Sequence, residues 1–150
     1  RGYARTPRSI EGVATFAGSD QFAAFADGLD IVVSVLPLTL ETTGIMNAGF
    51  FGMLADGAFI INGGRGPQVD DDDLLAALGS GKLGGAALDV FAVEPLPQDH
   101  PFWTHPKVRV WPHVAAQTNA TSAAEQVAAA ITAMMDGSEP ANRVDWSRGY

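Results

Sequence analysis

Three side chains that could bind a carboxylate and move a proton each follow a predicted strand. Arg65 lies in the glycine-rich segment NGGRG, Glu94 follows the apolar run Ala86–Phe91, and His113 follows Val108–Trp111. A guanidinium offers planar, paired donors that match a carboxylate. An imidazole exchanges a proton near neutral pH, and a neighbouring carboxylate favours its charged form and orients its ring. These residue types predict acid–base chemistry on an acidic substrate.

Each of the three residues also has an ordinary structural explanation. A lone arginine on a turn and a lone glutamate in a loop are most often solvated surface residues, and a lone histidine is as often structural as functional. These explanations weaken together, because all three residues fall at predicted carboxyl ends of strands. In an open α/β sheet, ligands bind in the crevice beyond those ends.

Two further histidines compete with His113 for the catalytic role. His100 and His105 lie in the segment HPFWTHP, and each precedes a proline. Neither follows a strand end, so we expect both to be loop residues that pack around Phe102 and Trp103.

The elements that would position these residues alternate between strands and helices. A continuous β-branched run such as Asp30–Leu36 (DIVVSVL) is typical of a parallel strand that is buried on both faces. The alternation predicts an α/β fold with a doubly wound parallel sheet. The predicted strands are Arg1–Ala4, Val13–Phe16, Asp30–Leu36, Gly57–Ile61, Gly85–Phe91 and Val108–Trp111; the predicted helices are Ser19–Asp27, Asn47–Leu54, Asp70–Leu78 and Ser122–Met135.

Polar residues mark the starts of three helices. Ser19 or Asp20 is expected to cap the first, Asp70 the third, and Ser122 with Glu125 has capping-box spacing. The carboxylates of residues 71–73 would face the positive end of their helix. That explanation accounts for the acidic run, so we predict no metal site.

Composition excludes several classes of protein. The chain has 150 residues, 47% hydrophobic and 17% charged, a formal net charge of −8 and no cysteine. A folded domain is expected, and the acidic balance argues against nucleic-acid binding. No apolar run approaches the roughly 20 residues of a membrane span. The absence of cysteine fits a reducing compartment, and we expect a cytoplasmic protein.

The combined motifs resemble the D-isomer-specific 2-hydroxyacid dehydrogenases, with the nearest likeness to the glyoxylate/hydroxypyruvate reductase branch. The resemblance rests on NGGRG, VDDDDLLAAL, GAALDVFAVEPLP, HPFWTHPKV, PHVAAQT and the ending VDWSRGY. It implies a Rossmann-like fold, a small 2-oxo or 2-hydroxy acid substrate and a homodimer. One departure stands at Gly64, where family members usually have alanine or serine, and a glycine would loosen the turn before Arg65.

The resemblance also implies residue roles. Arg65 would bind the substrate carboxylate and polarise the 2-oxo group, His113 would donate the proton, and Glu94 would pair with His113. Asp89 would hold the nicotinamide carboxamide. The remaining cofactor contacts implied by the likeness are Leu36, Pro37, Thr39 and Gly63, with Arg65 and His113 also facing the cofactor.

The first ten residues favour one form of the dinucleotide. In nicotinamide-binding sheets, an acid after the second strand binds the ribose 2′-OH, whereas an arginine suits a 2′-phosphate. Residues 1–10 contain no acid and three arginines, and Arg5-Thr6 matches NADPH-preferring relatives. The alternative is a merely basic loop. We predict Arg5 and Thr6 as cofactor-binding residues and NADPH as the cofactor.

The phosphate-binding signature G-x-G-x-x-G is absent from the sequence. In the strand order 3-2-1-4-5-6, the first two predicted strands would be strands 2 and 3. Strand 1 and its glycine turn would then lie upstream, leaving a gap beside strand 4. We therefore expect a dinucleotide-binding domain truncated at its start, spanning residues 1–139, and a tail, residues 140–150, that returns to a substrate domain.

Two other hypotheses remain open at this point. The chain could be a non-catalytic dinucleotide-sensing or partner-binding module, as in the related corepressor proteins, because fold alone does not define function. It could also be an inactive fragment of the enzyme. A complete set of arginine, glutamate and histidine favours the enzyme.

Overall fold

The computed structural model describes residues 1–146, and it divides the chain into two compact units, Arg1–His113 and Val114–Tyr150. The end of the predicted tail, residues 147–150, lies outside the described residues.

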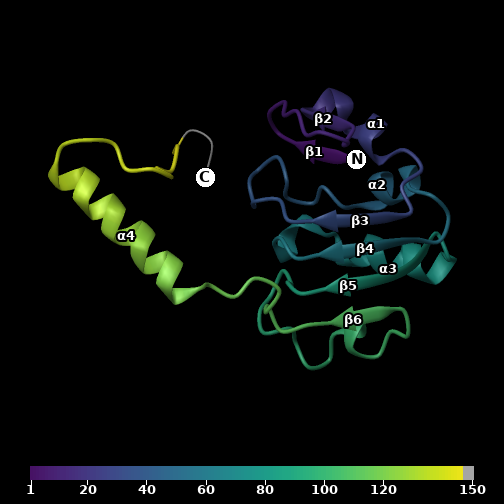
Figure 1. Ribbon diagram of the computed structural model, residues 1–150. Coiled ribbons are helices and arrows are strands. Elements are labelled where there is room, and N and C mark those ends of the chain that lie inside the picture. The colour runs from purple at the N-terminus through teal and green to yellow at the C-terminus, as the bar shows by residue number, and fades with distance from the viewer. Residues whose placement is uncertain (147–150) are drawn as a thin grey trace. The chain divides into compact units, whose positions relative to one another are not determined.

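Six parallel strands form two sheets in the first unit (Figure 1). The larger sheet has the order β3-β4-β5-β6, and the smaller pairs β1 with β2. The strands are β1 (Gly2–Ala4), β2 (Thr15–Ala17), β3 (Ile31–Ser34), β4 (Ala58–Asn62), β5 (Leu83–Leu88) and β6 (Val108–Val110). All six predicted strands are present, and the predicted α/β class is confirmed.

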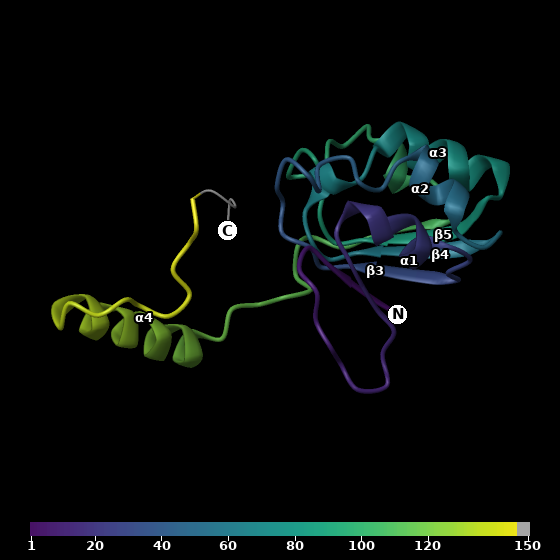
Figure 2. The same cartoon turned by 90° about the horizontal axis from the view of Figure 1, so that it is seen from above.

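Helices connect the strands of the first unit and cover one face of the larger sheet. They are the 3₁₀ turns η1 (Ser19–Gln21), η2 (Gly66–Gln68) and η3 (Pro101–Trp103), and the α-helices α1 (Phe22–Ala26), α2 (Ala48–Met53) and α3 (Asp71–Ser80). Figure 2 shows α2 and α3 on the same side of the sheet. Phe51 of α2 and Leu74 of α3 are fully buried there against Ile60 of β4. This packing supplies the core.

The exposure of β3 corrects one expectation. Val32 and Ser34 are each 6% exposed, whereas Ile31 and Val33 are each 60% exposed. Residues alternate between the two faces of a strand, and α2 and α3 cover only one of those faces. The prediction that this strand is buried on both faces is therefore wrong for the described residues.

A groove separates the two sheets of the first unit. In the described residues, β1 pairs only with β2 and β3 only with β4. Residues of both unpaired edges line a groove of about 230 Å³, with Tyr3 on one side, Val33 on the other, and Phe22, Phe25 and Phe50 also lining it. The expected break between the strands in positions 2 and 4 is confirmed.

The helix caps agree only in part with the predictions. The Asp70 carboxylate accepts a hydrogen bond from the Asp73 amide at the start of α3, as predicted. Gly18 occupies the cap position of η1 without a side-chain bond, so the proposed Ser19 or Asp20 cap is wrong.

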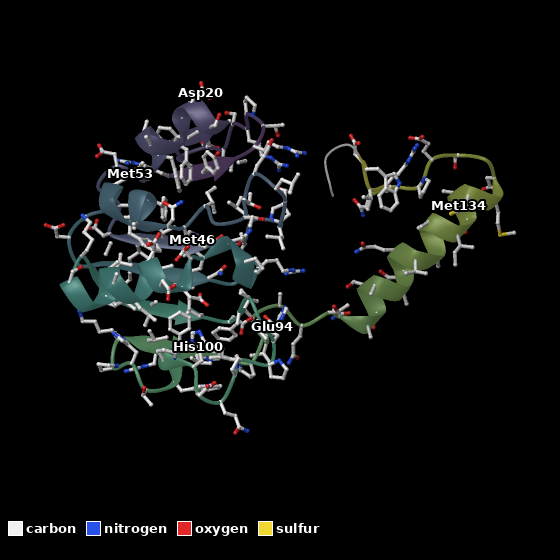
Figure 3. All side chains as sticks on the ribbon, turned by 180° about the vertical axis from the view of Figure 1, so that it is seen from behind. Asp20, Met46, Met53, Glu94, His100 and Met134 are labelled. Carbon is white, nitrogen blue, oxygen red and sulfur yellow. The ribbon has the colours of Figure 1, made fainter. Side chains whose placement is uncertain are left out.

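The second unit contains helix α4 (Ala120–Met135), whose C-terminal end carries Met134, labelled in Figure 3. Asn119 caps it by accepting from the Ser122 amide, so the predicted Ser122–Glu125 capping box is wrong. The helix contains no buried residue, and Ile131 is 54% exposed. Among residues 1–146, no helix combines the length and apolar character needed to cross a membrane.

Candidate active site

The three predicted catalytic residues follow three neighbouring strands of the larger sheet. Arg65 comes after β4, Glu94 after β5 and His113 after β6. Parallel neighbours place their carboxyl ends at one edge, the edge to which the arrows point in Figure 1. Figure 3 shows Glu94 at this edge. The topology therefore gathers the loops that carry all three residues.

Buried polar side chains shape the turn that carries Arg65. Asn62 is fully buried, and its amide donates to the Arg65 carbonyl at 3.2 Å while its side-chain oxygen accepts from the Gly64 amide at 3.0 Å. The Arg65 residue is exposed, and Nη1 donates to the Gly64 carbonyl at 2.7 Å. The turn is thus fixed through its backbone while it presents a charged group.

Gly66 brings this turn against the segment that leads to Glu94. A Cβ on Gly66 would lie 1.8 Å from the carbonyl carbon of Phe91. Only glycine permits so close an approach between two backbones. The Phe91 amide in turn donates to Glu94 Oε1 at 2.9 Å. Close backbone contact therefore links the arginine turn to the glutamate.

Glu94 and His113 form a pair at the end of β6. Glu94 Oε2 and His113 Nδ1 are 2.8 Å apart, and the side chains are 37% and 49% exposed. The hydrogen bond from His113 lowers the pKa of the Glu94 carboxyl, and the Phe91 amide lowers it further. The charge of Arg65 acts in the same direction. The pairing that the resemblance implied is present.

His113 has an unusual backbone conformation. Its φ of 56° lies in the left-handed region, which costs a non-glycine residue about 1 kcal/mol or more. Because Nδ1 faces Glu94, the ring's other nitrogen, Nε2, is the one that can serve a ligand. A carboxylate that orients an imidazole in this way is the arrangement of a general acid and base.

An apolar pocket of about 580 Å³ adjoins this pair. The indoles of Trp103 and Trp111 line it, and both are about half exposed. The sequence predicts loop packing for Trp103 and indicates no functional role for Trp111. The remaining lining residues are Phe91, Glu94, Pro95, Leu96, Val110, Pro112 and His113.

The two rival histidines lie in the loop between β5 and β6, and the predicted packing around Phe102 is present for His100. The His100 ring packs on Phe102 with centroids 4.4 Å apart, and its Nε2 lies 3.6 Å from an Asp71 carboxylate oxygen. Burial raises the pKa of that Asp71 carboxyl. His105 Nδ1 accepts from the Lys107 amide at 3.2 Å.

The residues that the resemblance assigns to the cofactor lie just beyond strand ends. Gly63 follows β4 and donates its amide to the Ser34 carbonyl at 3.0 Å. Asp89 follows β5, is 8% exposed, and donates its amide to the Asn62 carbonyl. Leu36, Pro37 and Thr39 follow β3. The Thr39 amide donates to Thr42 Oγ1, which fixes the turn.

The basic loop after β1 lines a separate pocket of about 480 Å³. Arg5 and Arg8 contribute to it together with Phe16, and one acid, Asp20, also lines it. Two guanidiniums suit a phosphate group. Thr6 is exposed and is not among the lining residues. The sequence analysis assigns no specific role to Arg8. Its place three residues after Arg5, in the motif RTPR, is the pattern that could have indicated that both arginines line one pocket.

Residues 1–146 contain no cluster of three or more histidine, aspartate or glutamate side chains that could hold a metal ion. The carboxylates at the start of α3 have structural partners instead. Asp73 accepts from the Ala48 amide at the start of α2, at 2.8 Å.

Comparisons with known proteins place the chain in a family. The family model "D-isomer specific 2-hydroxyacid dehydrogenase, NAD binding domain" matches residues 1–115. A glyoxylate/hydroxypyruvate reductase A of Serratia proteamaculans is 50% identical over the whole chain, which spans 48% of that relative. The chain thus spans about half the length of the curated relatives it matches.

Solved structures give the same result. A D-isomer specific 2-hydroxyacid dehydrogenase from Xanthobacter autotrophicus Py2, in complex with NADPH and MES, superposes with a TM-score of 0.96 at 46% identity, over 99% of this chain and 62% of that one. An NADPH-dependent glyoxylate/hydroxypyruvate reductase from Sinorhizobium meliloti, in complex with NADP and sulfate, gives 0.93 at 40% identity, over 99% and 48%. The chain belongs to the D-isomer specific 2-hydroxyacid dehydrogenase family.

Proposed function

We propose that the protein reduces a small 2-oxo acid of the glyoxylate or hydroxypyruvate type to the 2-hydroxy acid with NADPH. The observation that carries the proposal is the pair of His113 with Glu94, 2.8 Å apart, at the strand edge that also carries Arg65. The names of the relatives from Serratia proteamaculans and Sinorhizobium meliloti support the substrate class.

In this reaction the three residues have different roles. Arg65 binds the substrate carboxylate and stabilises the negative charge that develops on the carbonyl oxygen. His113 delivers a proton to that oxygen from Nε2, and Glu94 orients the imidazole through the hydrogen bond at Nδ1. NADPH, when bound, supplies the hydride. Asp89, Gly63 and the loop Leu36–Thr39 would hold its nicotinamide end.

The test is NADPH oxidation by the full-length protein on a panel of 2-oxo acids. We expect turnover with glyoxylate or hydroxypyruvate. Tight NADPH binding without turnover on any 2-oxo acid would instead support a dinucleotide sensor or a partner-binding module. We further propose that the full-length protein is a cytoplasmic homodimer, supported by the lack of cysteine and by the family resemblance.

The preference for NADPH is proposed to come from Arg5 and Arg8, because both line one pocket. Arg5→Ala should weaken NADPH binding by about 1.5–3 kcal/mol, the value of a charge-assisted hydrogen bond, and leave NADH binding nearly unchanged. Calorimetry with both cofactors measures this difference. Equal losses for the two cofactors would contradict the assignment.

A further inference from the structure

Gln68 is a buried polar residue to which neither the sequence nor the family resemblance gives a role. It ends the 3₁₀ turn η2, three residues after Arg65, and it is 0% exposed. Glutamine is seldom fully buried, and a buried amide is stable only when hydrogen bonds satisfy it. The hydrogen bonds of the Gln68 side chain therefore indicate its role.

The side chain of Gln68 uses all four of its hydrogen-bonding positions. Nε2 donates to the Leu36 carbonyl at 2.9 Å and to the Pro37 carbonyl at 3.1 Å. Oε1 accepts from the Arg65 amide at 3.1 Å and from Ser34 Oγ at 3.3 Å. A carboxamide has two donor hydrogens and two acceptor lone pairs, so its capacity is filled. The reversed orientation would set the amide nitrogen against the Arg65 N–H and the amide oxygen against two carbonyl oxygens.

These four bonds join two segments that are distant in sequence. One is the end of β3 with the loop after it, and the other is the turn that presents Arg65. Gln68 reaches that turn through the backbone amide of Arg65, which leaves the guanidinium to the substrate. We propose that Gln68 is a positioning residue that locks the arginine turn to the Leu36–Pro37 loop. The proposal rests on the proposed function for the roles of Arg65 and that loop.

Gly64 provides the space that this lock requires. A Cβ on Gly64 would lie 2.6 Å from Gln68 Oε1 and 3.0 Å from the Leu36 carbonyl oxygen. The glycine that departs from the family pattern is thus the complement of the buried amide. It does not loosen the turn, because Gln68 and Asn62 hold the turn on both sides.

The pair of Gly64 and Gln68 gives a specific test by double-mutant cycle. Gln68→Met keeps the length of the side chain and removes all four bonds. In the full-length protein, we expect it to raise the KM for the 2-oxo acid about 10-fold or more, with a smaller fall in kcat, because the carboxylate is bound before and during the reaction. NADPH affinity should also fall. Gly64→Ala should be harmful in the wild-type background and much less so when it is combined with Gln68→Ala, which removes the clashing amide.

Lys82→Met is the matched control. Its ammonium also donates to a backbone carbonyl, that of Leu54 at 2.7 Å, and its other partner is the Asp56 carboxylate, so it binds no residue of the proposed site. This variant should lose stability without a change in either KM. If Gln68→Met behaved in the same way, or if Gly64→Ala were equally harmful in both backgrounds, Gln68 would be merely structural and the proposal would be wrong.

Hydrogen exchange separates this proposal from the proposed function. The Arg65 amide should exchange slowly in the wild-type protein and at least about 10-fold faster in Gln68→Met, since its acceptor is lost. Amides of β4 and β5 should not change. Unaltered exchange at Arg65 would overturn the lock whatever reaction the protein catalyses. A missing 2-oxo acid reductase activity, with altered exchange, would overturn only the proposed function.

Discussion

A single imidazole at the end of β6 carries the proton transfer in the proposed reaction. His113→Gln keeps a polar group of similar reach and removes the titrating one. In the full-length protein, we expect kcat to fall roughly 100-fold or more, the scale of a lost general acid. Steady-state assays with NADPH and the preferred 2-oxo acid measure this.

The matched controls are His100→Gln and His105→Gln. His100 packs on Phe102 and His105 accepts from a backbone amide, so these variants should affect stability rather than kcat. Near-wild-type turnover of His113→Gln, or an equal loss in His100→Gln, would remove His113 from the catalytic role.

The ionisation of the Glu94 carboxyl bears on the stability of the fold at low pH. Its pKa is lowered from 4.5 by the bond from His113, so it stays charged throughout the neutral range. A lowered pKa means that the pair stabilises the fold fully above the ordinary value and that this stabilisation is lost as pH falls through the lowered one. Any change of activity in the neutral range therefore belongs to another group.

Glu94→Gln removes the charge and keeps the shape. The amide makes a weaker hydrogen bond to His113 Nδ1 than the carboxylate does, so the ring is less firmly oriented and kcat should fall about 10-fold or more. Steady-state assays of the two proteins at one neutral pH measure this fall. An unchanged kcat would show that the Glu94 carboxylate does not orient His113.

The elements of the fold follow from local patterns, and the contacts between them do not. Apolar runs predicted the strands of the larger sheet, and the Asp70 cap predicted the start of α3. The predicted strand Gly85–Phe91 ends instead at Leu88, because the close approach of Gly66 takes Phe91 into the turn region. That approach joins residues in different segments of the chain, and no local pattern announces it.

The same limit applies to the site. Arg65, Glu94 and His113 could be predicted because each follows a strand end. Gln68 could not, since its partners Leu36 and Pro37 belong to a different segment of the chain. Its only local sign was a glutamine between the glycine-rich turn and the Asp70 cap of the next helix.

The Gly66 contact can be tested as a packing element. A Cβ placed 1.8 Å from the Phe91 backbone cannot be accommodated without moving one of the two segments. Gly66→Ala should therefore lower the free energy of unfolding by about 3 kcal/mol or more. Denaturant unfolding of the full-length protein measures the change.

Gly79→Ala is the control within the same region. Gly79 lies in α3 with nothing within 4 Å of a built Cβ. Alanine there should stabilise the protein by about 0.5–1 kcal/mol, because helical glycine costs more backbone entropy. Equal effects of the two substitutions would show that the contact at Gly66 is not tight.

At the scale of the whole molecule, the separation of the two sheets limits what residues 1–150 can do alone. β1 and β3 each present one edge without a strand partner in the described residues, and the groove between them is lined by the aromatic rings of Tyr3, Phe22, Phe25 and Phe50. Unpaired strand edges readily pair with another chain. A parallel strand in this groove would join the sheets into one, in the order that the sequence analysis expects.

The phosphates of NADPH make this consequence measurable. No strand-to-helix turn in the sequence carries the G-x-G-x-x-G spacing whose helix N-terminus binds a pyrophosphate. Loss of two charge-assisted hydrogen bonds corresponds to roughly 100-fold or more in affinity. Residues 1–150 expressed alone should therefore bind NADPH at least that much more weakly than the full-length protein in calorimetry, with circular dichroism confirming that the shorter chain is folded. Equally tight binding by the shorter chain would show that the groove is complete as it stands and that these six strands have been assigned to the wrong positions.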